Sequence, residues 1–145
     1  MRSVVQRVKF ALVEIENKRI SEIGKGLLVL IGISHEDDGE QIEWMAKKLV
    51  NLRIFEDEKG KMNLSVLEVK GEILLISQFT LLGNCMKGRR PDFLDAAKPQ
   101  KAEKFYLELA AALQRNGIKP KLGEFGKHMS ITLLNDGPVT MILEK

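Results

Sequence analysis

The stretch that decides the fold lies near the middle of the chain and reads Glu72-Ile73-Leu74-Leu75-Ile76-Ser77-Gln78-Phe79-Thr80-Leu81-Leu82. Its first half, Ile73–Ile76, is a short apolar run of the kind found in strands that are buried on both faces. Its second half brings Ser77, Gln78 and Thr80, whose side chains form hydrogen bonds, into the same expected strand. Burying such a group without a partner costs about 1–3 kcal/mol. Either the fold or a bound ligand must therefore supply partners for these side chains.

Length and composition indicate one globular domain. The 145 residues, of which 44% are hydrophobic and 30% charged, are enough for one domain with its own core, spanning 1–145. The formal net charge of +3 permits a nucleic-acid partner without indicating one. The single cysteine, Cys85, fits a reducing compartment, and no apolar run is close to the length of about 20 residues that crosses a bilayer. We therefore expect a cytoplasmic protein without membrane contact.

Hydrophobic periodicity predicts two helices and several strands. One helix should cover 42–50 and be capped by Asp37 or Asp38, and a second should begin near Pro99 or Gln100 and end at Gly117. A long surface loop should fill 83–98. One or two strands are expected over Val4–Ile15. Single strands are expected at Arg19–Ile23, Leu27–Ile33, Arg53–Phe55, Ile73–Leu82, Lys119–Leu122, Ser130–Leu134 and Val139–Leu143. Two helices among many sequential strands favour an α+β domain.

The usual catalytic side chains are sparse. His35 and His128 are not at metal-ligand spacing from another His, a Cys or a carboxylate cluster, so we expect no metal site and no cofactor. Cys85 has no recognisable histidine partner, which makes it a poor nucleophile candidate. A triad of Ser77, His128 and an aspartate stays open, although no nucleophile-elbow pattern surrounds Ser77.

Two motifs carry a family resemblance: Ser77-Gln78-Phe79-Thr80-Leu81 and Asn135-Asp136-Gly137-Pro138-Val139-Thr140. Together with Met1–Val8, Gly24–Leu30, Asn51–Phe55 and Lys87–Pro91, in this order, they resemble the D-aminoacyl-tRNA deacylases. The resemblance covers nearly the whole chain. It implies an α+β fold of mixed, mostly antiparallel β-sheets packed with two main helices, and a homodimer. It also implies hydrolysis of D-aminoacyl-tRNA, with glycine mischarged on tRNA as a second substrate.

The first motif supplies the candidate catalytic residues Ser77, Gln78, Phe79 and Thr80. None carries a group that ionises near neutral pH. Backbone N–H groups around Phe79 and Thr80 are candidates for holding the ester carbonyl, as in an oxyanion hole. The resemblance implies that the 2′-hydroxyl of the terminal ribose assists the reaction and that side chains contribute little. The alternative is Thr80 as a hydroxyl nucleophile, for which the sequence offers no base.

The second motif supplies a candidate chirality filter, Gly137 and Pro138. The resemblance implies that their peptide bond is cis and that the pair reaches into the pocket of the partner subunit. There it would hold the amino end of the amino acid and leave no space for an L side chain. The active site would then lie at the subunit interface and accept achiral glycine.

The remaining candidates concern tRNA binding. Lys87, Arg89 and Arg90 form a basic cluster that we expect to contact tRNA phosphates, the alternative being a solvated loop. Phe125 and Met129 align with an apolar strip that, as the resemblance implies, lines the pocket for the terminal adenosine. The alternative function class is a non-catalytic module that binds RNA ends.

Overall fold

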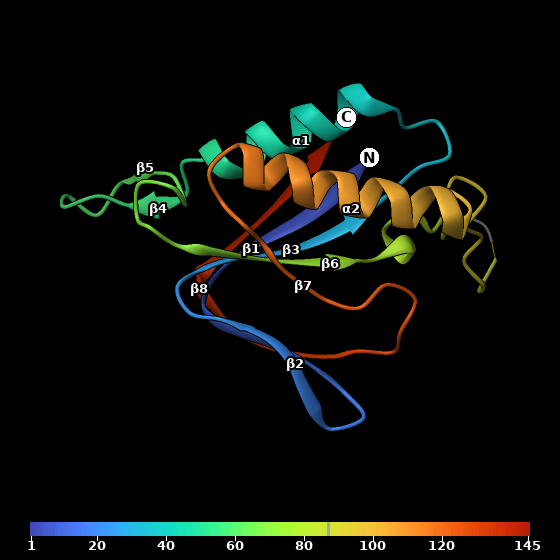
Figure 1. The fold of residues 1–145 in the computed structure, drawn as a ribbon, viewed down its shortest axis with the longest axis horizontal. Coiled ribbons are helices and arrows are strands. Elements are labelled where there is room, and N and C mark those ends of the chain that lie inside the picture. The colour runs from blue at the N-terminus through green and yellow to red at the C-terminus, as the bar shows by residue number, and fades with distance from the viewer. Residues whose placement is uncertain (87) are drawn as a thin grey trace.

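The computed structural model describes residues 1–86 and 88–145, which form a curved main sheet covered by two helices (Figure 1). The helices are α1 (Gly39–Asn51) and α2 (Pro99–Arg115), and a short 3-10 helix, η1 (Phe79–Leu82), directly follows a central strand. The strands are β1 (Arg2–Ile15), β2 (Lys18–Ile23), β3 (Gly26–Gly32), β4 (Phe55–Glu56), β5 (Met62–Leu64), β6 (Glu72–Ser77), β7 (Lys121–Leu122) and β8 (Ser130–Glu144). The predicted α+β class with two main helices is confirmed.

The long strand β1 is the centre of the main sheet. β8 pairs antiparallel with almost its whole length, from Glu144 opposite Arg2 to Ser130 opposite Glu14. β3 pairs with the first half of β1 and β2 with the second half, so these two strands share its other edge. β3 then pairs in parallel with β6, and β6 with β7, which makes the sheet mixed. β4 and β5 form a separate hairpin.

Alternation along β6 divides the core between the two faces of the sheet. Ile73 and Leu75 belong to the larger cluster, which includes residues of α1 and α2, whereas Leu74 and Ile76 pack with residues of β1 and β2 on the other face. Figure 1 shows the two helices together on one face and the β1–β2 hairpin curling away below the sheet. All four side chains are fully buried, as the apolar run predicts. Within the described ranges, no helix is long and apolar enough to cross a membrane.

Several strand assignments differ from the sequence-based expectation. β5 is not among the expected strands, and the strand expected at Lys119–Leu122 is β7, which begins at Lys121. The expected strand Ile73–Leu82 ends at Ser77, because its partner β3 ends at Gly32 and no strand continues alongside; 79–82 then form η1. The two strands expected at 130–134 and 139–143 are one strand, β8, whose register shifts twice opposite the continuous β1. The short strand expected at 53–55 is β4, which begins at Phe55.

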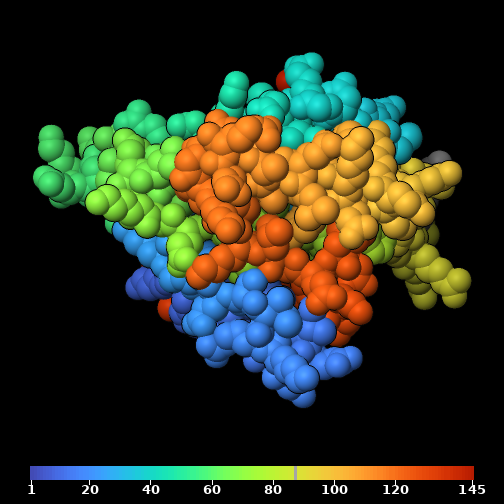
Figure 2. Space-filling model, in the orientation of Figure 1, coloured from blue at the N-terminus to red at the C-terminus, as the bar shows by residue number. Residues whose placement is uncertain are grey.

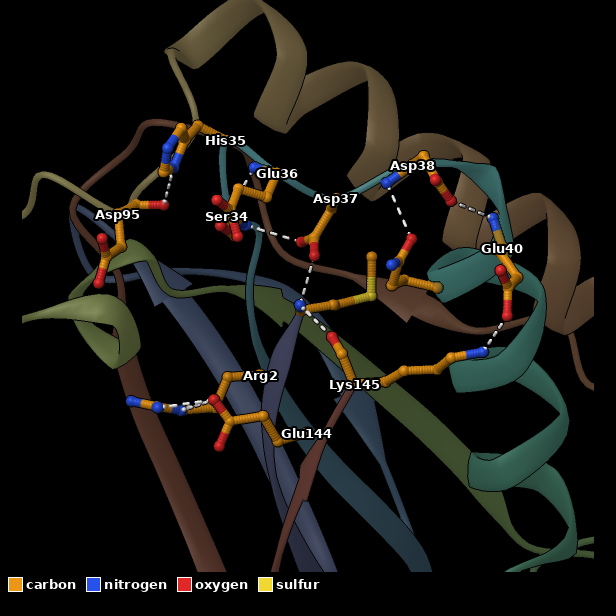
Figure 3. A network of polar contacts seen from close by, with 12 residues as sticks. Arg2, Ser34, His35, Glu36, Asp37, Asp38, Glu40, Asp95, Glu144 and Lys145 are labelled. Carbon is orange, nitrogen blue, oxygen red and sulfur yellow. Dashed lines mark hydrogen bonds and ion pairs between the residues drawn. The ribbon is translucent and has the colours of Figure 1, made fainter.

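The start of α1 is tied to the ends of β1 and β8 (Figure 3). Asp38 is the N-cap: it accepts a hydrogen bond from the Glu40 N–H, and its own N–H donates to the Gln41 side chain, which completes a capping box. Asp37 instead forms an ion pair with the amino group of Met1, which also donates to the Lys145 carbonyl at 2.7 Å.

Candidate functional site

A pocket of about 690 Å³ opens where β6 runs into η1. Its lining comes from the end of β6 with the start of η1, from the loop that leads into α2 and the first turn of that helix, and from the loop before β8. Ser77, Gln78 and Phe79 belong to the first part, and Phe125 and Met129 to the last. The fold thus brings most of the predicted catalytic segment to the two residues predicted to bind adenosine, in a pocket of the size that small ligands occupy.

The polar side chains that line this pocket are Ser77, Gln78, Lys127 and His128. The Gln78 side-chain amide donates to the Thr80 hydroxyl, and the Gln78 N–H donates to the Ile31 carbonyl. Among the described residues, the N–H groups of Phe79 and Thr80 have no hydrogen-bond partner, as is usual for the first N–H groups of a helical turn. These two donors can therefore bind an oxygen atom of a ligand.

Two aromatic rings stand at the edge of the pocket. Phe79 is 56% exposed, and its ring meets that of Phe93 edge-on, with centroids 5.0 Å apart. Sequence reasoning missed Phe93, whose position in a charged loop gave no periodic signal. An exposed aromatic ring beside a pocket offers a stacking surface for a nucleic-acid base.

Tyr106 of α2 supports the apolar side of the pocket. Its hydroxyl donates to the Leu75 carbonyl at 2.7 Å and lies 3.3 Å from the Gly123 carbonyl. Burial raises the pKa of Tyr106 above its ordinary value, so the hydroxyl keeps its proton and remains a donor. This contact fixes β6 relative to the segment that leads to Phe125, whose ring centroid lies 6.1 Å from that of Tyr106.

The second motif forms an exposed irregular segment in the middle of β8. The Gly137–Pro138 peptide bond is cis, and Gly137 has φ +125°, a conformation that L residues rarely adopt. Asn135 braces the segment: its side-chain oxygen accepts from the Val139 N–H at 3.1 Å, and its amide donates to the Thr140 hydroxyl at 3.0 Å. The backbone of Gly137 and Pro138 is therefore held in place by its own neighbours in the motif.

Arg7 of β1 is a second brace, which sequence reasoning did not single out. It is 4% exposed, and its guanidinium donates to the Asp136 carbonyl at 3.1 Å and to the Ile54 carbonyl at 2.7 Å. The same group forms an ion pair with Glu56 at 3.4 Å. One signal in the sequence could have identified Arg7. Alternate residues of a strand face the same side, so Arg7 lies on the same buried face as Ser3 and Val5 although its side chain is charged.

The two motifs do not meet within one chain. Ser77 pairs with Ile31, which pairs with Ser3 of β1, whereas the second motif lies opposite the Gln6–Val8 part of β1. Strand geometry, with about 3.3 Å per residue and about 4.8 Å between strands, puts roughly 13 Å along β1 and roughly 14 Å across the sheet between them. Gly137 and Pro138 are accordingly absent from the pocket lining.

The other candidate residues lie outside the pocket or at its edge. Arg89 and Arg90 are exposed in the loop after η1, which projects at one end of the molecule (Figure 2), and do not line the pocket; Lys87 lies outside the described residues. His128 lines the same pocket as Ser77, but no Asp or Glu is among the described lining residues, so the triad alternative lacks its acid. Cys85 is exposed elsewhere. In the described part of the chain, no group of three His, Cys, Asp or Glu residues could hold a metal ion.

Hydrolysis at this site should depend on neither a metal ion nor a thiol. Excess chelator and Cys85→Ala should each leave the initial rate within about twofold of the untreated enzyme, because neither group has a place beside the N–H donors. The measurement is the initial rate of amino acid release. A loss of tenfold or more in either arm would place the chemistry elsewhere.

Comparison with known proteins points in one direction. A family model described as D-Tyr-tRNA(Tyr) deacylase matches residues 4–144. A D-aminoacyl-tRNA deacylase of Thermosipho africanus (strain TCF52B) is 52% identical over 144 residues, which cover 99% of this chain and 97% of that protein. The protein of the same name from Fusobacterium nucleatum subsp. nucleatum is 55% identical, with coverage of 99% and 95%.

Solved structures agree with this fold. A structure of a c-Myc DNA unwinding element binding protein superimposes with a TM-score of 0.96 at 44% identity, covering 100% of this chain and 99% of that one. A probable eukaryotic D-amino acid tRNA deacylase superimposes with a TM-score of 0.82 at 18% identity, covering 98% and 97%; that likeness concerns the fold alone.

Proposed function

The chain belongs to the D-Tyr-tRNA(Tyr) deacylase family, and from this premise we propose that it hydrolyses the ester bond of D-aminoacyl-tRNA, releasing a D-amino acid and free tRNA. Glycine mischarged on tRNA is the proposed second substrate. The observation that carries the proposal is the pocket that joins Ser77, Gln78 and Phe79 to Phe125 and Met129. As an enzyme acting on tRNA, the protein would work in the cytoplasm.

The pocket suits the terminal adenosine of a tRNA. Its volume of about 690 Å³ is large enough for a nucleoside. Phe125 and Met129 offer apolar surface to the base, and Phe79 and Phe93 add aromatic rings at the edge. An adenosine bound there would bring the ester on its ribose to the end of β6.

Catalysis at this position would rest on backbone groups and on the substrate itself. The N–H groups of Phe79 and Thr80 would bind the carbonyl oxygen as negative charge develops on it. The 2′-hydroxyl of the ribose, next to the ester, would assist the attack on the carbonyl. Thr80 is a weaker candidate nucleophile, because its hydroxyl oxygen already accepts a hydrogen bond from Gln78 and no carboxylate lines the described pocket.

Selection against L-amino acids would come from Gly137 and Pro138 of the partner subunit in a homodimer. Two observations support a second copy. The two motifs lie far apart within one chain, and β8 is an edge strand of the sheet. Near this edge Leu134 is 47% and Ile142 69% exposed, and exposed apolar side chains on a sheet are a common feature of subunit interfaces.

The proposed activity is tested by incubating the purified protein with D-tyrosyl-tRNA and L-tyrosyl-tRNA in parallel. Free D-tyrosine should accumulate, and L-tyrosyl-tRNA should decay no faster than without enzyme. Tight binding of both without release would favour the RNA-end-binding module instead. Uncharged tRNA and a DNA duplex serve as binding competitors.

The basic loop should contribute to tRNA affinity through phosphate contacts. Arg89→Gln or Arg90→Gln should weaken binding to all tRNAs alike and reduce the slope of log K against log salt by about one unit per lost contact. Lys59→Gln, in the turn between β4 and β5, is the matched control. Figure 1 shows the β4–β5 hairpin at the opposite end of the molecule from the loop after η1. A slope equal to that of the control would mean that the loop is merely solvated.

A further inference from the structure

Arg2, at the start of the central strand β1, reaches across to the candidate catalytic segment. Its guanidinium donates through Nη1 to the Leu81 carbonyl at 2.9 Å. Through Nε and Nη2 it donates to one carboxylate oxygen of Glu144 on β8, at 3.1 and 2.7 Å. Figure 3 shows the Arg2 and Glu144 side chains extended alongside each other at the end of these two strands. The contact joins residues that are far apart in sequence.

The Leu81 carbonyl belongs to the last turn of η1, where backbone acceptors have no helical partner of their own. Within this turn the Thr80 carbonyl accepts from the Gly83 N–H at 3.0 Å, so the Arg2 guanidinium and the Gly83 N–H cover two consecutive carbonyls. A cation at the C-terminal end of a helical turn is also electrostatically favourable. Arg2 therefore closes the end of the turn whose beginning carries the free N–H groups of Phe79 and Thr80.

Gly32 of β3 completes the seat of η1. It is the cross-strand partner of Arg2. A Cβ at this position would lie 3.1 Å from the Gln78 carbonyl oxygen and 3.2 Å from Leu81 Cβ. Gly32 thus lets the turn lie directly on the sheet, and its neighbour Arg2 holds the turn there. The four residues of η1 form few hydrogen bonds among themselves. The position of η1 is therefore set by its contacts with Gly32 and Arg2, which are distant in sequence.

We infer that Arg2 is a positioning residue of the deacylase reaction, which holds η1 so that the Phe79 and Thr80 N–H groups point at the ester carbonyl. The inference rests on the proposed function. Arg2 itself touches neither the pocket lining nor, on this account, the substrate. Its loss should therefore slow the chemical step and leave substrate affinity unchanged, since a misplacement of about 1 Å at a catalytic group can cost up to about 100-fold in rate.

The test compares Arg2→Met, Arg2→Lys and a matched control in single-turnover assays with D-tyrosyl-tRNA. The control is Arg19→Met, which removes an exposed arginine that is also paired with a glutamate, Glu22, but contacts no backbone carbonyl. Arg2→Met should lower the rate of the chemical step by about tenfold or more with KM within about twofold of the wild type. Arg2→Lys should recover part of the loss, because an ammonium can still donate to the Leu81 carbonyl.

Hydrogen exchange of the Leu81 and Gly83 amides, which donate to the Gln78 and Thr80 carbonyls, provides a readout that does not depend on activity. It should accelerate in Arg2→Met and stay at the wild-type rate in Arg19→Met. Unchanged exchange, or an unchanged chemical rate, would overturn the inference. So would a raised KM with a reduced salt slope, which would make Arg2 a phosphate contact. A wild-type protein without hydrolytic activity would instead refute the proposed function, while the exchange comparison would still decide whether Arg2 holds η1.

Discussion

Removing the 2′-hydroxyl from the terminal ribose of D-tyrosyl-tRNA should slow its hydrolysis by about 100-fold or more, the usual contribution of a well-placed acid–base group. The physical reason is the composition of the pocket. Its described lining includes the Ser77 hydroxyl, the Gln78 amide, the Lys127 ammonium and the His128 imidazole but no carboxylate or thiol. In the proposed mechanism the substrate therefore supplies the assisting hydroxyl. The measurement is the single-turnover rate with a 2′-deoxy substrate carrying the amino acid on the 3′-oxygen.

Two variants make this result specific. Thr80→Ala removes the rival hydroxyl, and His128→Ala removes the one imidazole in the described lining. Each should cost less than about tenfold, because the proposed mechanism uses neither as nucleophile or base. The opposite ranking, with a severe loss in Thr80→Ala and a mild one with the deoxy substrate, would make Thr80 the nucleophile.

Two inactive variants should restore activity when they are mixed, if Gly137 and Pro138 serve the pocket of the partner subunit. The first is Phe79→Pro, which removes one of the two N–H groups proposed to bind the carbonyl, at the first position of η1, where a helical turn tolerates proline. The second is Gly137→Ala, which adds a methyl group to the proposed filter. In a mixed dimer one site carries both changes and the other carries neither. Random exchange should then recover about a quarter of the wild-type activity.

Gly137→Ala needs its own control, because the substitution also strains the fold. Its Cβ would lie 2.8 Å from Val139 Cγ2 and 3.0 Å from Arg7 Nη2, at a φ of +125°. We therefore expect a lower melting temperature as well as lost activity. Gly60→Ala is the control: Gly60 has φ +71°, and a methyl group there would meet open space. Its melting temperature measures the loss of stability caused by a positive φ alone, without steric contacts. Mixed dimers that are verified by mass spectrometry and remain inactive would show that the filter acts within its own chain or not at all.

Much of the fold follows from local sequence patterns, and the exceptions have identifiable causes. The apolar run Ile73–Ile76 predicts a strand buried on both faces, and Asp38 begins α1 as expected. The sequence of Phe79-Thr80-Leu81-Leu82 predicts a continuation of the strand, because its residues are apolar or β-branched. What ends the strand is the length of its neighbour β3, together with Gly32 and Arg2, which are distant in sequence. No window along the chain contains that information.

In the candidate site, too, some residues could be predicted from the sequence and others only from the structure. Ser77, Gln78, Phe125 and Met129 were found through motifs and resemblance, and the fold places them around one pocket. Phe93 and Arg7 were missed, because an aromatic residue in a loop and a charged residue in a strand acquire meaning only through contacts that the fold creates. Arg7 in particular is buried only because carbonyl groups from two other segments come within reach of its guanidinium.

The guanidinium of Arg7 also links the second motif to the β4–β5 hairpin. One rigid planar group holds the Ile54 carbonyl and Glu56 at the base of the β4–β5 hairpin and the Asp136 carbonyl beside Gly137. A displacement of the second motif would pull on a hairpin whose turn includes the exposed Lys59. If substrate binding moves Gly137 and Pro138, a fluorophore attached at position 59 would report it from a site outside the pocket lining.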